Sequence, residues 1–91
     1  MAYPTATEIE NCLKALAEEA GDTTASPFRV DIVARYGGKP PLYAVMIRSS
    51  QKELIRARLG EVLDRSFSLG GTSFALNLME AQKILQHPRK S

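Results

Sequence analysis

From Phe28 to Tyr36, apolar side chains alternate with side chains that are polar except for Val33. This period of two predicts a half-buried strand. The next residues, 37–41 (Gly-Gly-Lys-Pro-Pro), predict a turn, because glycine allows positive φ and proline cannot donate to a strand ladder. Residues 42–47 (Leu-Tyr-Ala-Val-Met-Ile) are apolar at every position. They predict a second strand that is either buried on both faces or has one face reserved for a partner.

A helix is expected on each side of this strand pair. Thr7 and Glu10 have the spacing of a capping box, so the first helix is predicted over residues 8–20, and Gly21 follows at the position of a left-handed C-cap. Ser50 and Glu53 have the same spacing, with Ser49 as a competing cap, which predicts a second amphipathic helix that runs to about residue 63.

The C-terminal part alternates again over residues 72–78, which predicts a third strand. Residues 79–86 fit either a short helix or a turn with a fourth short strand. Because a helix joins strands two and three, they are expected to be parallel through a right-handed crossover. The chain is therefore predicted to be a single α+β domain, residues 1–91, of order α-β-β-α-β with a short C-terminal element. It would form a two-layer α/β sandwich, ferredoxin-like or KH-like, with a mixed sheet of three to four strands.

The second strand supplies the first candidate binding surface. If its even-numbered residues face the helices, its odd-numbered residues face outward next to the first strand. The candidate partner-binding residues are then Val33, Tyr43, Val45 and Ile47. Such an exposed apolar row is typical of a surface that is buried against another subunit. In the alternative interpretation, residues 79–85 fold over this face.

Charge supplies the second candidate surface. Residues 1–26 contain five acidic side chains and one basic side chain, whereas residues 27–91 contain eleven basic and five acidic ones. The candidate nucleic-acid contacts are Arg29, Arg35, Lys39, Arg48, Lys52 and Arg56, with Tyr36 and Tyr43 as candidates for base stacking. The alternative is that these residues simply form ordinary solvated faces.

Candidate catalytic chemistry is sparse. The single histidine, His87, lies far along the chain from the single cysteine, Cys12, which is expected to be a buried structural thiol. No His, Cys or carboxylate spacing fits a metal site, so we expect no enzyme activity, no metal and no cofactor. The N-terminus lacks the pattern of a signal peptide, and no apolar run approaches the length of about 20 residues that a membrane helix needs. The expected location is the cytoplasm.

Four segments resemble the C-terminal domain of the alpha subunit of translation initiation factor two from eukaryotes and archaea. The likeness is carried, in order, by residues 9–16, by 40–47 with Pro-Pro-Leu-Tyr, by Gly70-Gly71 and by 79–85. The chain departs from the family by an additional Tyr-Gly-Gly-Lys before the prolines and by lacking the family's threonine run after this strand. The resemblance implies an α/β domain that docks on the factor's gamma subunit and has no catalysis of its own.

These observations together predict a non-enzymatic protein-binding module, with a translation-initiation-like domain as its most specific form. An RNA-binding domain that uses the basic face remains an alternative. So does a small standalone inhibitor or adaptor, such as a virus-encoded one. A homodimer is compatible with the same apolar surface.

Overall fold

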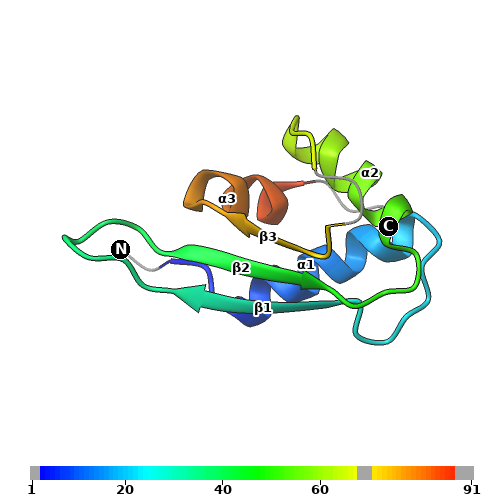
Figure 1. Ribbon diagram of the computed structural model, residues 1–91, viewed down its shortest axis with the longest axis horizontal. Helices are drawn as coiled ribbons and strands as arrows, with labels where there is room; N and C mark the ends of the chain where they lie inside the picture. The colour runs from blue at the N-terminus through cyan, green and yellow to red at the C-terminus, as the bar shows by residue number, and fades with distance from the viewer. Residues whose placement is uncertain (1–2, 68–70, 88–91) are drawn as a thin grey trace.

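The computed structural model describes residues 3–67 and 71–87 (Figure 1). The elements in chain order are α1 (Ala6–Glu19), β1 (Phe28–Val33), β2 (Leu42–Ile47), α2 (Lys52–Leu63), β3 (Ser73–Leu76) and α3 (Leu78–Gln86). The strands form one sheet of order β1-β2-β3, in which β2 pairs antiparallel with both neighbours. The predicted α+β class with a helical layer on a sheet is confirmed.

The core lies between one face of the sheet and the helices. The central strand β2 contributes Tyr43, Val45 and Ile47, none of which is more than 2% exposed. The other strands contribute Phe28, Val30 and Leu76, and the helices add Ile9, Cys12, Leu13, Leu16, Ala17, Ile55, Leu59, Leu63, Ala81 and Ile84. α1 packs mainly on β1, while α2 packs mainly on α1 and α3. The core therefore uses only one face of the sheet.

The predicted parallel crossover is wrong, and so is the mixed sheet. The backbone N–H of Ile47, at the end of β2, donates to the carbonyl of Thr72, just before β3 begins. The chain thus returns to the sheet beside the point where it left, and β3 must run back antiparallel to β2. This return is possible because α2 packs on the other helices instead of crossing the sheet from end to end.

The start of α1 differs from the prediction by two residues. Thr5 and Glu8, not Thr7 and Glu10, form the capping box, with each side chain accepting from the other residue's backbone N–H. Glu10 instead accepts a hydrogen bond of 3.1 Å from the backbone N–H of Val30. At the other end, Gly21 has φ of +96°. The N–H of Gly21 donates to Glu18, and that of the next residue donates five residues back, which forms a Schellman motif.

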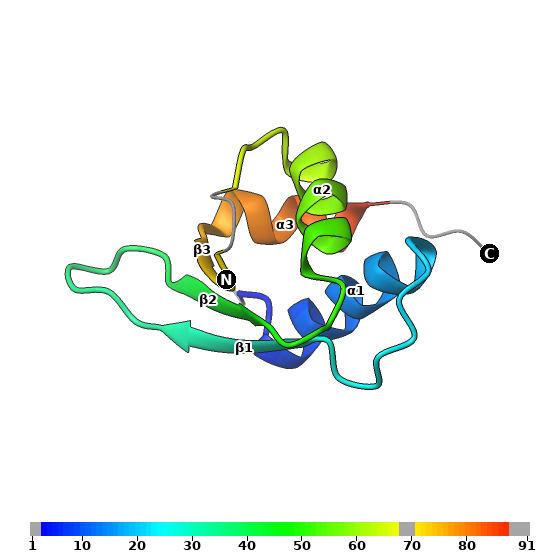
Figure 2. The same cartoon turned by 45° about the vertical axis from the view of Figure 1, so that its right-hand side comes forward.

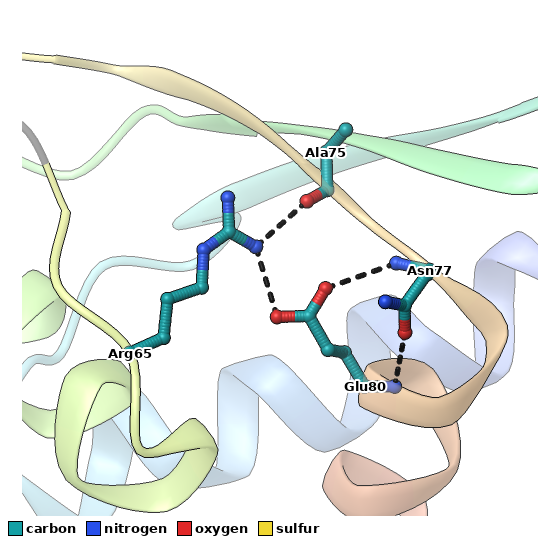
Figure 3. A network of polar contacts seen from close by, with 4 residues as sticks. All are labelled: Arg65, Ala75, Asn77 and Glu80. Atoms are coloured by element: carbon teal, nitrogen blue, oxygen red, sulfur yellow. Dashed lines mark hydrogen bonds and ion pairs between the residues drawn. The ribbon is translucent and has the colours of Figure 1, made fainter.

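Charged side chains occupy both edges of the sheet. Glu10 accepts from the outer edge of β1, and Arg65 donates to the carbonyl of Ala75 on the outer edge of β3 over 2.9 Å. Arg65 also contacts Glu80 at 2.9 Å, and Glu80 closes the capping box of α3 with Asn77 (Figure 3). This network fixes the end of α2, the edge of β3 and the start of α3 together. Edge strands engaged in this way discourage the addition of a further strand.

The β1–β2 hairpin extends beyond the helices (Figures 1 and 2). β1 ends at Val33, three residues before the predicted end, and the loop turns through Gly37 and Gly38, both with positive φ. Ile32 is 48% exposed and Tyr36 is 98% exposed. The apolar phase of the alternation would place both side chains on the core side of the sheet, but they are exposed because no helix covers the sheet this far out. The exposure of Tyr36 leaves its ring available for base stacking.

The start of α2 differs from the prediction, whereas its end at Leu63 agrees with it. Its N-cap is Gln51, without a side-chain cap, so the capping box of Ser50 with Glu53 is not formed. Ser49 is buried, and its hydroxyl accepts from the N–H of Gln51 over 2.9 Å. After Leu63 the C-cap residue Asp64 adopts φ of +51°, and its backbone N–H donates to the carbonyl of Gly60.

The C-terminal segment forms the helix α3, which decides between the two predicted alternatives. Ala81 and Ile84 face the core, and α3 lies on the same side of the sheet as the other core elements. Residues 79–85 therefore do not cover the opposite face.

Gly60 in α2 is required by a close backbone approach. A Cβ at this position would lie 2.9 Å from the carbonyl oxygen of Arg65. Replacing glycine by alanine in an exposed helix normally stabilises it by about 1 kcal/mol. Here we expect Gly60→Ala to destabilise the fold by about 1–3 kcal/mol, because the clash involves backbone that cannot move aside easily. Urea denaturation measures the change, with Ala57→Gly as the helix-propensity control. A more stable Gly60→Ala variant would contradict this role.

Tyr43 connects the central strand to the segment before α1. Its hydroxyl donates to the carbonyl of Pro4 over 2.7 Å. Burial raises the pKa of Tyr43, and the neighbouring Glu8 and Tyr3 raise it further. Above pH about 10 the unfolded chain loses this proton while the folded chain retains it, so the free energy of unfolding should fall as the pH rises.

We therefore expect Tyr43→Phe to reduce stability by about 1 kcal/mol at pH 7, through loss of the hydrogen bond. This difference from the parent chain should shrink as the pH rises above about 10, since phenylalanine has no proton to lose. Chemical denaturation between pH 7 and pH 11 measures both effects. A constant difference between the two proteins over this range would show that Tyr43 does not titrate as argued.

Candidate functional site on the open face of the sheet

The predicted orientation of β2 is wrong. Tyr43, Val45 and Ile47 point into the core, so they are not available as an exposed row. The physical reason is that all six residues of β2 are apolar, and the alternation that normally identifies the buried face is absent. Val33 keeps its predicted outward position and is 46% exposed.

The opposite face of the sheet is left uncovered by the helices. We call it the open face, and it comprises Arg29, Asp31, Val33, Leu42, Ala44, Met46, Ser73 and Ala75. None of these residues is buried. The apolar members form a continuous band, because Val33 pairs with Leu42 and Ala44 pairs with Ala75.

The centre of the open face is a shallow hollow. Its volume is about 350 Å³, and it is lined chiefly by Ala44, Ala75, Met46, Arg29 and Asp31. The floor is low because the two alanines lie side by side on neighbouring strands. Met46 stands beside this floor and is 46% exposed. A hollow with a floor of small residues beside an exposed methionine is able to receive a protruding apolar side chain, because the methionine side chain is flexible.

Charge on the open face is balanced. Arg29 and Asp31 lie two residues apart on β1, so their side chains point to the same side. Their closest polar atoms, Nε and Oδ2, are 3.4 Å apart, and both side chains are more than half exposed. The face therefore presents one positive and one negative group beside its apolar band.

The six predicted nucleic-acid contacts do not form one surface. Arg56 is buried and donates to the carbonyl of Gly71, so it is a structural residue. Arg35 and Lys39 lie in the hairpin loop, whereas Arg48 and Lys52 lie beyond the other end of β2. A strand of six residues spans about 20 Å, which separates the two pairs. Arg29 lies opposite Met46, at the end of the sheet nearer Arg48, and contacts Asp31.

Another hollow, of about 210 Å³, contains two guanidinium groups. It lies between Arg56, Arg65 and Phe67. Both arginines already donate to backbone carbonyls, and Arg65 also pairs with Glu80 and stacks over Phe67. These contacts account for the two charges within the fold and leave the hollow without an evident ligand.

Sequence reasoning missed a buried polar cluster between the two loops that flank the hairpin. Asp22 is 2% exposed and accepts from both the backbone and the hydroxyl of Thr24, and Ser49 lies next to that hydroxyl. Hydrogen bonds from Ser49 and Thr24 hold the pKa of Asp22 below its ordinary value, against the opposing effect of burial. The Asx-turn spacing of Asp22 and Thr24 was the available signal. The cluster connects the loop that follows α1 with the loop that follows β2.

Within residues 3–67 and 71–87, no three His, Cys, Asp or Glu side chains gather in a way that could hold a metal ion. The same residues contain no helix long and apolar enough to cross a membrane. Comparison of the chain with protein-family models, curated proteins and solved structures finds no match. The resemblance to the initiation-factor domain therefore stays a prediction.

Adjacent residues on β2 provide a direct test of the observed orientation. Val45→Ala should cost about 2–3 kcal/mol of stability, because it removes buried methyl groups and leaves a cavity. Met46→Ala should change stability by less than about 0.5 kcal/mol, because Met46 faces outward. Thermal and urea unfolding of the two variants, compared at a low protein concentration, measure the difference. Equal losses would contradict the assignment of the open face.

Proposed function

We propose that this chain is a non-enzymatic protein-binding module that works through its open face. The partner surface would be apolar in the middle, with a group of each charge at its margin to meet Arg29 and Asp31. The observation that carries the proposal is the continuous apolar band on an uncovered sheet face. Sheets of this kind commonly carry polar side chains on the face turned to water, so an apolar outer face is unusual.

The state of the sheet edges supports binding through the face. A partner that added a strand would need free backbone groups along an edge. Glu10 already occupies the N–H of Val30 on β1, and Arg65 occupies the carbonyl of Ala75 on β3. Packing on the face requires no such backbone groups, because it is driven by apolar burial.

The resemblance to the initiation-factor domain adds a specific candidate partner, the gamma subunit of that factor, and a cytoplasmic place of action. A standalone inhibitor or adaptor would use the same face on a different target. Both remain forms of the same proposal, since the open face is the contact surface in each.

RNA binding remains the second candidate, and it rests on the hairpin loop. There Arg35 and Lys39 flank Tyr36, which is 98% exposed and free to stack on a base. Only this group of the predicted basic residues surrounds an exposed ring. A salt-sensitive affinity for single-stranded RNA that falls on Lys39→Glu would favour this function over the first.

A site-specific cross-linker at position 46 tests the proposal. Met46 on the open face and Met79 on α3 are both exposed, at 46% and 69%, so each accepts a photoreactive phenylalanine derivative with little effect on folding. We expect irradiation in cells to give one defined protein adduct from position 46 and none from position 79.

The adduct should disappear when Ala44→Arg places a bulky charge in the hollow, with the melting temperature of that variant used to confirm folding. Absence of any protein adduct at position 46, or an adduct that is indifferent to Ala44→Arg, would refute protein binding by the open face. Cross-linking to RNA instead, centred on the hairpin loop, would shift the assignment to the second candidate.

A further inference from the structure

We infer that the open face packs against the open face of a second copy of this chain. This inference rests on the proposed function and names its partner. It depends on the order of residues along the three strands, which is self-complementary in both charge and shape.

The register of the sheet divides the open face into rungs that run across the strands. One rung contains Arg29, Met46 and Ser73, and another contains Asp31, Ala44 and Ala75. The intervening rung contains Val30, Val45 and Phe74, whose side chains point toward the helices. The two outward rungs are therefore equivalent in position on either side of a rung that contributes no side chain to the face.

A two-fold axis placed over the middle rung, perpendicular to the strands and parallel to the sheet, exchanges the two outward rungs. Each strand then lies over its own copy in the opposite direction. Arg29 lies over Asp31 of the second copy, and Asp31 lies over its Arg29. The ion pair that each chain forms within itself at 3.4 Å is thus replaced or extended by two pairs between copies.

The same axis brings the apolar groups into register. Met46 lies over Ala44 of the second copy, at the hollow of about 350 Å³ that Ala44 and Ala75 line. The exposed methionine of each chain fills the hollow of the other. Facing sheets pack about 10 Å apart, a separation that a methionine opposite an alanine suits well. One two-fold rotation therefore makes the two faces complementary in both charge and shape.

The size of the face sets the expected strength. Two strands about 20 Å long and a third of four residues, about 4.8 Å apart, cover only a few hundred square ångströms. This is below the ~800 Å² that each partner of a standard interface buries. We therefore expect a reversible dimer with a dissociation constant in the micromolar range. The balanced charge of the face favours a like partner, since neither a basic nor an acidic surface would satisfy both Arg29 and Asp31.

Charge exchange across the two-fold axis gives a specific test. In Arg29→Glu, the new glutamate of each copy faces Asp31 of the other copy, so the dimer contains two contacts between carboxylates. In Asp31→Arg, the new arginine of each copy faces Arg29 of the other copy, so the dimer contains two contacts between guanidinium groups. Sedimentation equilibrium over a hundredfold concentration range should show that each single variant dimerises about tenfold more weakly or worse. An equimolar mixture of the two should recover dimers, because every contact is then between opposite charges. The double variant should also recover them.

Lys52→Glu is the control, since it makes the same change in net charge as Arg29→Glu at an exposed position outside the open face. It should leave the dissociation constant unchanged. A parent chain that stays monomeric up to millimolar concentration, or single variants that are not rescued by mixing, would overturn the inference. If the parent chain is monomeric while position 46 cross-links to a different protein, the second copy is the wrong partner but the proposed function stands. If there is neither a dimer nor a protein adduct, both fail.

Discussion

The side-chain alternation of β2 is the constraint on which the rest of the structure depends. As the central strand it pairs with both neighbours, so its phase decides which side of every strand faces the helices. Placing Tyr43, Val45 and Ile47 inward brings Phe28 and Val30 of β1 and Leu76 of β3 to the same side. A shift by one residue would expose all of these and bury Arg29 and Asp31, at a cost of several buried side chains worth about 1.5–3 kcal/mol each.

Much of the fold is readable from the sequence because local signals agree with it. The alternation from Phe28, the two glycines after Tyr36 and the helical pattern around Leu13 each predicted the element that the structure contains. The starts of helices were less secure, because Thr5 and Thr7 are each followed by a glutamate three residues later. Only the contact of Glu10 with β1, 20 residues away, decides between them. Strand direction was likewise missed, since it depends on how α2 packs on the other helices.

The candidate site was harder to predict than the fold, and the reason lies in composition. Residues 42–47 are apolar on both faces, so they carry no record of which face is buried. The polar residues that would have given the answer lie on β1, where Arg29 and Asp31 face away from the core. To infer from these two residues which side of β2 is buried, one must know that Arg29 pairs with Met46. The loop between the strands sets this pairing, and the sequence shows the length of the loop but not the register it produces.

The absence of polar residues from β2, which makes its buried face hard to predict, is also an argument for an interface. A central strand with water on one side would be expected to carry polar residues there, and threonine or lysine at positions 42, 44 and 46 would leave the core unchanged. Leu42, Ala44 and Met46 instead form an apolar band over the middle of the sheet. The edges are engaged by Glu10 and Arg65, which leaves the face as the surface where this band can be buried. A strand that is apolar on both faces is best explained if both faces are covered. The helices of this chain cover one face, and a binding partner would cover the other.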